Sequence, residues 1–352
     1  MGKKLRFQKI LWYLAGILLL SVFLLAVYPP QKPPQLDVRT VGPGRLGGGF
    51  YYHAADVAEL ENGNPWTPQS RLRRLPIFRQ NDLEQELEPQ QRLALAQEFG
   101  ARFGVQVFPS PHEHTHTFTD FAGGTIRVLG AGSYQISFDQ LPFGPPDWFP
   151  DSVATADEEQ TLSMLNFFLK RYGKTLGIEK PVDCTDRYPD HRLYVSAYEG
   201  KGNLTERFVA WHFNRVGFFY DEGSFIISRR TPDDLERIGY YPILSPDEAR
   251  QMLLEGFYTT NPYSPGGADR APAPDPDKIA GVDLIYFPDY FSVTVPFYQF
   301  YLPAPLNLVG QYFYTDGRDQ GEVLQSYFVP AIPLEYVKNP SVFGARFADW
   351  TK

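Results

Sequence analysis

Three histidines stand close together in His112-Glu113-His114-Thr115-His116, and imidazole is a common metal ligand. On an extended chain this spacing places His112, His114 and His116 on one face, where they could bind zinc or copper. However, the stretch follows Pro109-Ser110-Pro111, and zinc sites usually take their ligands from separated segments. We therefore favour an exposed polar loop, keep the three histidines as metal candidates, and expect no bound metal or cofactor.

Nucleophilic catalysis needs a serine or cysteine beside a positioned base. The only cysteine, Cys184, has Asp183 and Asp186 close to it, and negative neighbours disfavour the reactive thiolate. The serine signatures G-x-S-x-G and S-x-x-K are both missing from the sequence. A third group of candidates comprises Asp233, Asp234 and Glu236, which lie in a polar connector where solvated charge is ordinary. We predict no catalytic residue and a passive, buried Cys184, and we leave the carboxylates unassigned.

Aromatic residues make up 16% of the chain and gather between residues 286 and 301. Rings fall on both faces of a strand here, because side chains alternate along it. This pattern is typical of a buried central strand. The alternative is a groove that receives a peptide or a partner strand, since tyrosine and phenylalanine supply contact area at interfaces. The interface candidates are Tyr286, Phe291, Phe297 and Tyr298.

Residues 10–28 form an apolar run without charge, about as long as a helix that crosses a membrane. Four basic residues precede it, namely Lys3, Lys4, Arg6 and Lys9. Positive charge favours the cytoplasmic side, so we expect a single-pass anchor in the cell membrane with the N-terminus inside and the body outside. The alternative is a cleaved signal, which would have a shorter apolar core and an A-x-A end.

The charge of the body bears on its partners. The first 28 residues carry four of the 33 basic residues and none of the 41 acidic ones, which leaves a net charge of about −12 for the rest. A surface this acidic repels phosphate backbones, so we expect no nucleic-acid partner. A lone cysteine forms no intramolecular disulfide, so burial must supply the stability of the body.

Three helical patterns are each followed by strand-like runs. The first has apolar residues at helical spacing from Leu93 to Phe103, before strands at 125–129 and 133–138. The second has a capping box at Thr155 and Glu158 and ends at Gly173. The strands expected after this second helix are 192–198, 208–213 and 224–229.

The third pattern has the strongest start signal. Ser245 can cap the helix, Pro246 suits its first position, and Glu248 can bond back to the cap amide. The strands expected after this third helix are 282–287, 293–301, 311–315 and 323–329. Pro296 and Pro330 should confine their strands to edges or bulges.

Isolated helices among runs of strands favour an antiparallel α+β fold. We expect a single N-terminal transmembrane helix followed by two or three helix-plus-antiparallel-sheet units, each helix covering its own small sheet. The predicted segments are a cytoplasmic N-terminus at 1–9, the anchor at 10–28, a Pro/Gly-rich linker at 29–76, units at 77–150, 151–234 and 235–338, and a tail at 339–352.

The sequence from Gly239 to Ala249, GYYPILSPDEA, and the later Tyr327-Phe328-Val329-Pro330-Ala331-Ile332 resemble PepSY-type modules. The layout is similar to the YycH and YycI accessory proteins of Gram-positive bacteria, mainly over residues 235–335. The resemblance implies a module without catalytic activity that binds or restrains a protein in or at the membrane, such as a sensor kinase. The alternative hypothesis is a cell-surface hydrolase with an unrecognised site.

Overall fold

The computed structural model describes residue 13 and residues 32–39, 51–53, 63–80, 88–108, 118–121, 124–128, 134–138, 157–187, 193–221, 224–230, 235–260, 273–286, 293–304 and 323–343. The chain divides into two units, Met1–Gln35 and Leu36–Lys352. The elements below all belong to the second unit.

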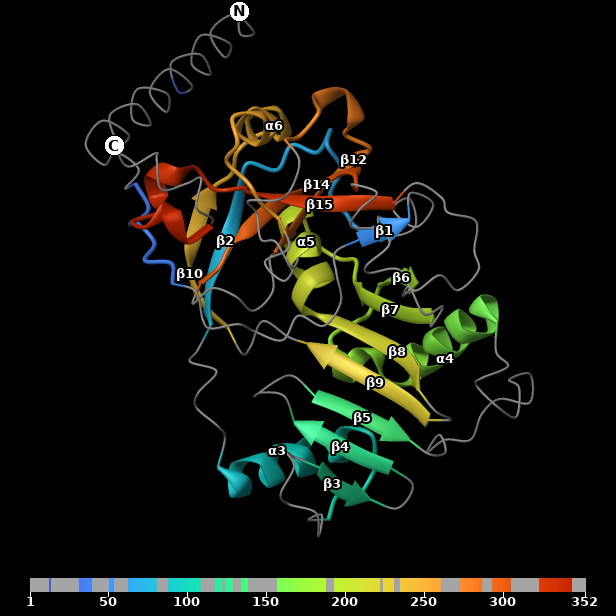
Figure 1. Ribbon diagram of the computed structural model, residues 1–352. Helices are drawn as coiled ribbons and strands as arrows, with labels where there is room; N and C mark the ends of the chain where they lie inside the picture. The colour runs from blue at the N-terminus through green and yellow to red at the C-terminus, as the bar shows by residue number, and fades with distance from the viewer. Residues whose placement is uncertain are drawn as a thin grey trace, which may run out of the picture. The chain divides into compact units, whose positions relative to one another are not determined.

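The largest sheet has seven antiparallel strands in the order β3-β4-β5-β9-β8-β7-β6 (Figure 1). Their bounds are β3 Phe118–Phe121, β4 Gly124–Val128, β5 Tyr134–Phe138, β6 Pro181–Arg187, β7 Leu193–Glu199, β8 Arg215–Asp221 and β9 Ser224–Arg230. The pairing of β5 with β9 joins two hairpin regions about 90 residues apart in the chain. One sheet therefore takes strands from both the first and the second predicted unit.

Two helices cover one face of this sheet. They are α3, Pro89–Arg102, which contacts β4, and α4, Glu158–Leu176, which contacts β7. The two helices meet where the rings of Phe103 and Phe168 stack with centroids 5.9 Å apart. This face and the two helices form one hydrophobic core.

The second helix differs from its prediction at both ends. Asp157 is the N-cap of α4 and accepts from the Gln160 amide, whereas Thr155 lies outside the described residues. The helix continues past Gly173 and ends at Gly177, which has φ of 70°. Glycine reaches this left-handed conformation without a steric penalty, so Gly177 is the better stop signal.

Two further sheets lie around the other core. The first has the order β1-β15-β14-β12, with β11 also on β15, and the second has the order β10-β2-β13. Their bounds are β1 Tyr51–His53, β2 Arg74–Gln80, β10 Leu235–Pro242, β11 Thr259–Thr260, β12 Gly281–Tyr286, β13 Val293–Thr294, β14 Pro296–Pro303 and β15 Val323–Pro330. Short 3₁₀ turns cover Pro276–Lys278, Leu334–Tyr336 and Pro340–Phe343.

Helix α6, Pro246–Leu254, packs on β15 and confirms the predicted start signal. Ser245 Oγ accepts from the Glu248 amide at 3.2 Å, and Glu248 Oε2 accepts from the Ser245 amide at 2.7 Å. The side chains of Ala249, Met252 and Leu253 are buried. The helix is thus fixed by a reciprocal cap at one end and by an apolar face along its length.

The predicted strand 293–301 is two strands in different sheets. Val293 and Thr294 pair with β2, whereas Pro296–Pro303 lies between β12 and β15. The expectation that Pro296 confines its strand to an edge or a bulge is wrong, because β14 pairs with β12 and with β15 and neither pairing has a register shift. Proline is tolerated there since it is the first residue of its strand.

The predicted strand 208–213 is instead part of helix α5, Leu204–Phe213. Asn203 caps it and Glu206 completes the capping box, while Phe208 and Trp211 are buried at a spacing of three residues. This is a helical signature, and the aromatic content of the segment concealed it.

The predicted fold class is also wrong as a whole. Across the parts of the chain that the structure describes, no helix has the length and apolar character needed to cross a membrane. Residues 10–28, apart from Tyr13, lie outside those parts. Nor does each helix cover a small sheet of its own, because the large sheet is shared and β1 and β2 come from the predicted linker or its boundary. The described residues form a mixed fold with four α-helices and several antiparallel sheets.

Candidate functional site

The face of the seven-stranded sheet opposite α4 brings together four chemically capable side chains. The register pairs Cys184 with Ser196 between β6 and β7, and Tyr198 with Arg215 between β7 and β8. Ser196 and Tyr198 are two residues apart on β7, so all four project to one face. Cys184, Ser196 and Tyr198 are almost fully buried. Helix α5 contacts β7 and β8 and adds further polar groups.

Cys184 lies directly against the backbone of Gly63. A Cβ at Gly63 would be 2.2 Å from Cys184 Sγ, and the φ of Gly63 is 88°. Glycine is therefore required here both for space and for backbone conformation. The carbonyl of Gly63 accepts the hydroxyl of Tyr198 at 2.8 Å. Burial raises the pKa of Tyr198 to about 12, and nearby Cys184 adds to the rise.

Ser196 is held by an arginine and not by a base. Arg215 donates to Ser196 Oγ from Nε at 3.2 Å and from Nη2 at 2.7 Å. The same guanidinium lies over the ring of Trp211, with Cζ 5.6 Å from its centroid. A guanidinium stays protonated at any physiological pH, so it cannot remove the serine proton.

His212 on α5 is the nearest potential base, and its lone pair is already used. Its Nε2 accepts from the backbone amide of Tyr286 on β12 at 3.1 Å. As a whole residue His212 is partly buried, but the rings of Phe208, Trp211 and Tyr286 lie around its imidazole at centroid distances of 4.3 to 5.2 Å. Burial holds the pKa of His212 well below its usual value, Arg215 lowers it further, and a backbone hydrogen bond with Leu284 opposes both.

The cluster therefore joins two sheets. His212 binds the edge strand β12 of one sheet, while Arg215 ties the end of α5 to β7 of the other. Nucleophilic catalysis needs a hydrogen bond from nucleophile to base, and neither Cys184 nor Ser196 makes one to His212 among the contacts of the described residues. We read this cluster as a structural joint. No local sequence pattern indicates this cluster, because its members come from four separate elements, β6, β7, β8 and α5.

The candidate interface residues that can be placed lie in the core. Tyr286, Phe297 and Tyr298 are each no more than 4% exposed. The Tyr286 hydroxyl donates to the Pro76 carbonyl on β2, and the Tyr298 hydroxyl donates to the Leu244 carbonyl before α6, both at 2.7 Å. Burial raises the pKa of both phenols. Phe291 lies outside the described residues.

The metal candidates His112, His114 and His116 also lie outside the described residues, as do Asp233 and Asp234. Within the described ranges no group of three or more His, Cys, Asp or Glu side chains could hold a metal ion. Glu236 is exposed and forms an ion pair with Arg79 across the β10–β2 pairing, with 3.0 Å between Oε2 and Nη1. Its position fits the solvated charge expected from the sequence.

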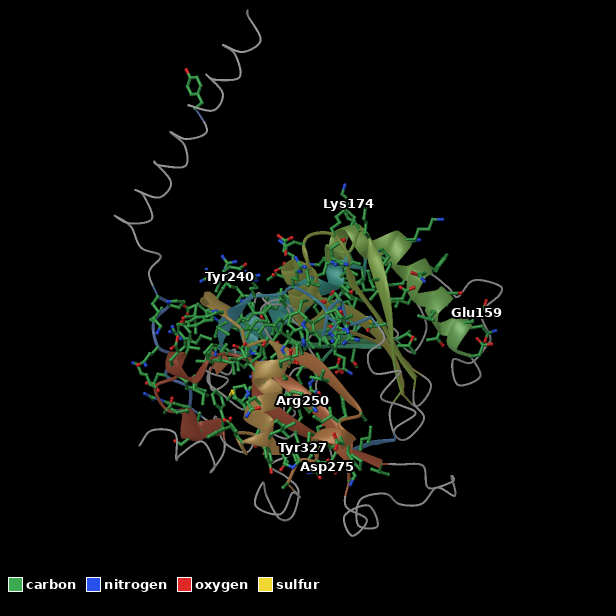
Figure 2. The ribbon with its side chains drawn as sticks, turned by 90° about the horizontal axis from the view of Figure 1, so that it is seen from above. Glu159, Lys174, Tyr240, Arg250, Asp275 and Tyr327 are labelled. Atoms are coloured by element: carbon green, nitrogen blue, oxygen red, sulfur yellow. The ribbon has the colours of Figure 1, made fainter. Side chains whose placement is uncertain are left out.

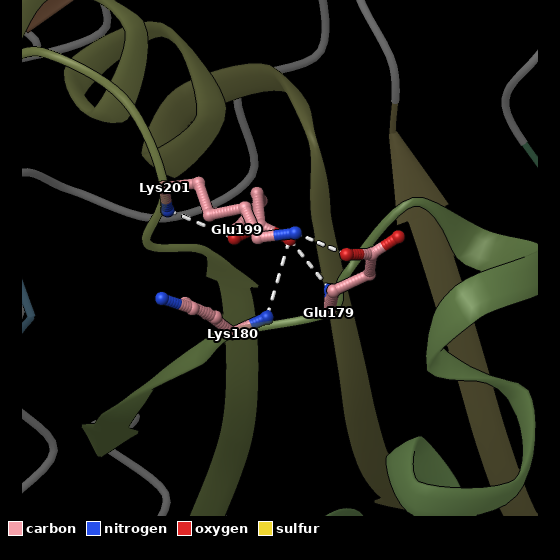
Figure 3. Close-up of polar contacts among 4 residues, drawn as sticks. All are labelled: Glu179, Lys180, Glu199 and Lys201. Carbon is pink, nitrogen blue, oxygen red and sulfur yellow. Dashed lines mark hydrogen bonds and ion pairs between the residues drawn. The ribbon is translucent and has the colours of Figure 1, made fainter.

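A second charged group closes the end of the β6–β7 hairpin (Figure 3). Glu199 accepts from the backbone amides of Glu179, Lys180 and Lys201 at 2.5, 3.2 and 2.8 Å, and the Lys201 ammonium pairs with the Glu179 carboxylate. Hydrogen bonding to Lys201 lowers the pKa of Glu179 and raises that of Lys201 in return. The Glu199 carboxylate and the ion pair of Lys201 with Glu179 hold the two chain segments together here, so the group fixes local structure.

The open edge of β10 is the exposed feature that the sequence did not reveal. Among the strands that the structure describes, β10 pairs with β2 on one side and has no neighbour on the other. Glu236, Arg237 and Tyr240 on this strand are exposed, and Tyr240 keeps 43% of its surface. Tyr240 is labelled in Figure 2. A bulge interrupts the register between Arg237 and Gly239. An exposed strand edge offers backbone groups to an incoming chain.

Comparisons with known proteins give little further guidance. No protein family matches the sequence, and no curated protein matches it. An uncharacterized protein from Eubacterium rectale shows a distant structural likeness, with a TM-score of 0.27 and 9% sequence identity, over 74% of this chain and 84% of that one.

Proposed function

We propose that this chain is a binding protein without catalytic activity that regulates another protein by pairing with it along β10. The observation that carries the proposal is the open edge of β10, with its exposed side chains. Strand addition uses such an edge for main-chain hydrogen bonds and its side chains for specificity. The hydrolase alternative has no comparable support among the described residues, where Cys184, Ser196 and His212 are engaged in structural contacts.

The edge is supported from behind, which suits it for binding. Its neighbour β2 lies between β10 and β13, and the Pro76 carbonyl of β2 accepts the Tyr286 hydroxyl. Tyr241 of β10 is fully buried, and its ring meets that of Tyr336 at 5.9 Å and 90°. A strand held in this way keeps its geometry while free, so less ordering cost opposes association.

The location and the partner class are part of this proposal. The positive charge before the apolar run predicts that the body works outside the cytoplasm, and the resemblance to PepSY-type modules implies a partner in or at the membrane, such as a sensor kinase. Residue 240 would then face a membrane protein or one bound near it.

Photo-crosslinking in living cells tests the proposal. A photoreactive phenylalanine analogue replaces Tyr240 in the full chain, and the matched control places it at Phe167, an aromatic residue on α4 that is 38% exposed. We expect one discrete protein adduct from position 240 and none of the same mass from position 167. Removing this protein from the cell should also change the activity of the partner that is crosslinked. No adduct at 240, or the same adduct at both positions, would contradict the proposal.

A further inference from the structure

Positive charge gathers beside the open edge of β10, and it shows what kind of segment would pair there. On β10, Tyr240 and Arg237 lie opposite the residues of β2 that are two and four positions after Arg74. Side chains alternate between the two faces of a strand, so Arg74, Tyr240 and Arg237 share one face of the sheet. Arg74 Nη2 donates to the Tyr240 carbonyl at 2.7 Å, and the guanidinium of Arg237 lies 5.5 Å from the centre of the Tyr240 ring. Both arginines are thus positioned around one exposed aromatic.

Within the described ranges, no acidic side chain forms an ion pair with Arg74 or Arg237. Arg71 and Arg73 precede β2 and are also exposed. Across the described ranges the one ion pair made by an arginine of β2 or β10 is that of Arg79 with Glu236. The whole chain has a net charge of −8, so these exposed arginines form a local positive patch on a protein that is acidic overall.

We propose that β10 binds an extended protein segment with acidic side chains at alternate positions. This inference rests on the proposed function and specifies the partner's chemistry. Carboxylates at every second residue of an added strand fall on one face, about 7 Å apart. They can accept paired hydrogen bonds from guanidinium groups such as those of Arg74 and Arg237. The ring of Tyr240 then packs against the aliphatic parts of the same segment.

Two other occupants fit less well. A second copy of this chain paired through β10 would bring the arginines of both copies together, and like charges placed opposite each other across two strands are destabilising. A nucleic acid would offer phosphates to the arginines, but the body carries a net charge of about −12, which repels a long polyanion. An acidic segment of a few residues meets only the local positive charge.

Fluorescence anisotropy with the full chain tests the inference directly. The probes are a labelled peptide of alternating Glu and Val, its Lys counterpart, and oligothymidylate of equal charge. The variant is Arg74→Gln/Arg237→Gln. Its matched control is Arg171→Gln/Arg250→Gln, because Arg171 lies 5.6 Å from the Tyr172 ring and Arg250 donates to the Pro276 carbonyl at 3.1 Å.

We expect the Glu peptide to bind, the Lys peptide not to bind, and the first variant to weaken binding about three- to tenfold, with the control unchanged.

Two further probes carry N-methyl groups on alternate amides, one set for each edge of the peptide. A paired strand uses one edge, so one of these probes should lose binding and the other keep it. Equal binding of the Glu and Lys peptides, retention by both methylated probes, or tighter binding of the oligonucleotide would overturn the inference.

The outcome is separable from that of the proposed function. If crosslinking at Tyr240 captures a specific partner while the arginine variant binds the Glu peptide normally, the edge binds a protein but the acidic specificity is wrong. If no partner is captured at Tyr240, the proposed function itself is wrong. The oligomeric state in solution adds a third readout. A dimer that is lost in Tyr240→Lys would assign the edge to self-association and overturn the inference that it binds an acidic segment.

Discussion

Acid should weaken the joint at His212, and the size of the effect can be worked out. The imidazole is held neutral in the fold, because burial keeps its pKa well below the usual value and its Nε2 must accept the Tyr286 amide. In the unfolded chain a histidine has a pKa of about 6.5. Below that pH the unfolded state binds more protons than the folded state, so stability falls as the pH falls.

For one such histidine the linkage gives a loss of about 1.4 kcal/mol in the free energy of unfolding between pH 7.5 and 5.5, provided that the folded pKa lies below that window. Carboxylates contribute at lower pH, because the ones with lowered pKa, such as Glu248, lose their stabilisation only below about pH 4.5. The window from 7.5 to 5.5 therefore isolates histidine.

Urea unfolding followed by tryptophan fluorescence at the two pH values measures the loss, and Trp211 beside His212 reports on the joint. His212→Gln is the control, since a glutamine oxygen can accept the Tyr286 amide but does not titrate. His212→Leu should cost a further 1–3 kcal/mol or so at both pH values, because it leaves that amide unpaired. If His212→Gln loses as much stability as the natural chain between pH 7.5 and 5.5, the reasoning is wrong.

Three further predictions concern other parts of the chain. Leu253→Ala should lower the free energy of unfolding by about 2–5 kcal/mol and Ser245→Ala by about 0.5–2 kcal/mol, so the first variant should show the lower midpoint in urea. If Ser245→Ala instead kept its stability but lost a measurable hydrolytic activity, Ser245 would be a nucleophile. Gly63→Ala should cost more than Gly104→Ala in the same assay, because both have positive φ but only the first meets a side chain, and equal losses would contradict this. The histidine cluster at 112–116 should hold no stoichiometric metal after purification without an affinity tag, and one zinc or copper per chain that its triple replacement removes would refute that expectation.

Local chemistry made some elements predictable and left others hidden. The start of α6 could be read from Ser245 and Glu248, because a capping box lies within four residues. The same signature at Asn203 and Glu206 predicts the start of α5, whereas the aromatic run after it favours a strand. A cap should outweigh aromatic content when the two disagree, since the cap specifies backbone conformation directly.

Pairings between distant segments left no local trace. Nothing near Tyr134 indicates that it lies opposite Arg229, and nothing near Val293 indicates that it leaves its neighbours to pair with β2. The alternation rule found that the strand around Tyr298 is buried on both faces, but it could not tell which sheets the rings would join. Such choices depend on the packing of whole layers, which one segment does not encode.

Tyr286 shows how the binding edge and the large sheet are connected. Its amide donates to His212 on α5, its hydroxyl donates to Pro76 on β2, and its ring meets Phe78 of β2 at 5.9 Å and Phe213 of α5 at 4.9 Å. Strand β2, which pairs with β10, is therefore fixed to α5 through Tyr286 and through the direct contact of Phe78 with Phe213 at 5.2 Å. The backbone of β10 is already ordered before a segment pairs with it. The affinity therefore depends on the entropic cost of ordering the incoming segment and on the charges of that segment's side chains. For this reason the arginines beside the edge, and not the buried rings that the sequence emphasised, should determine which partner binds.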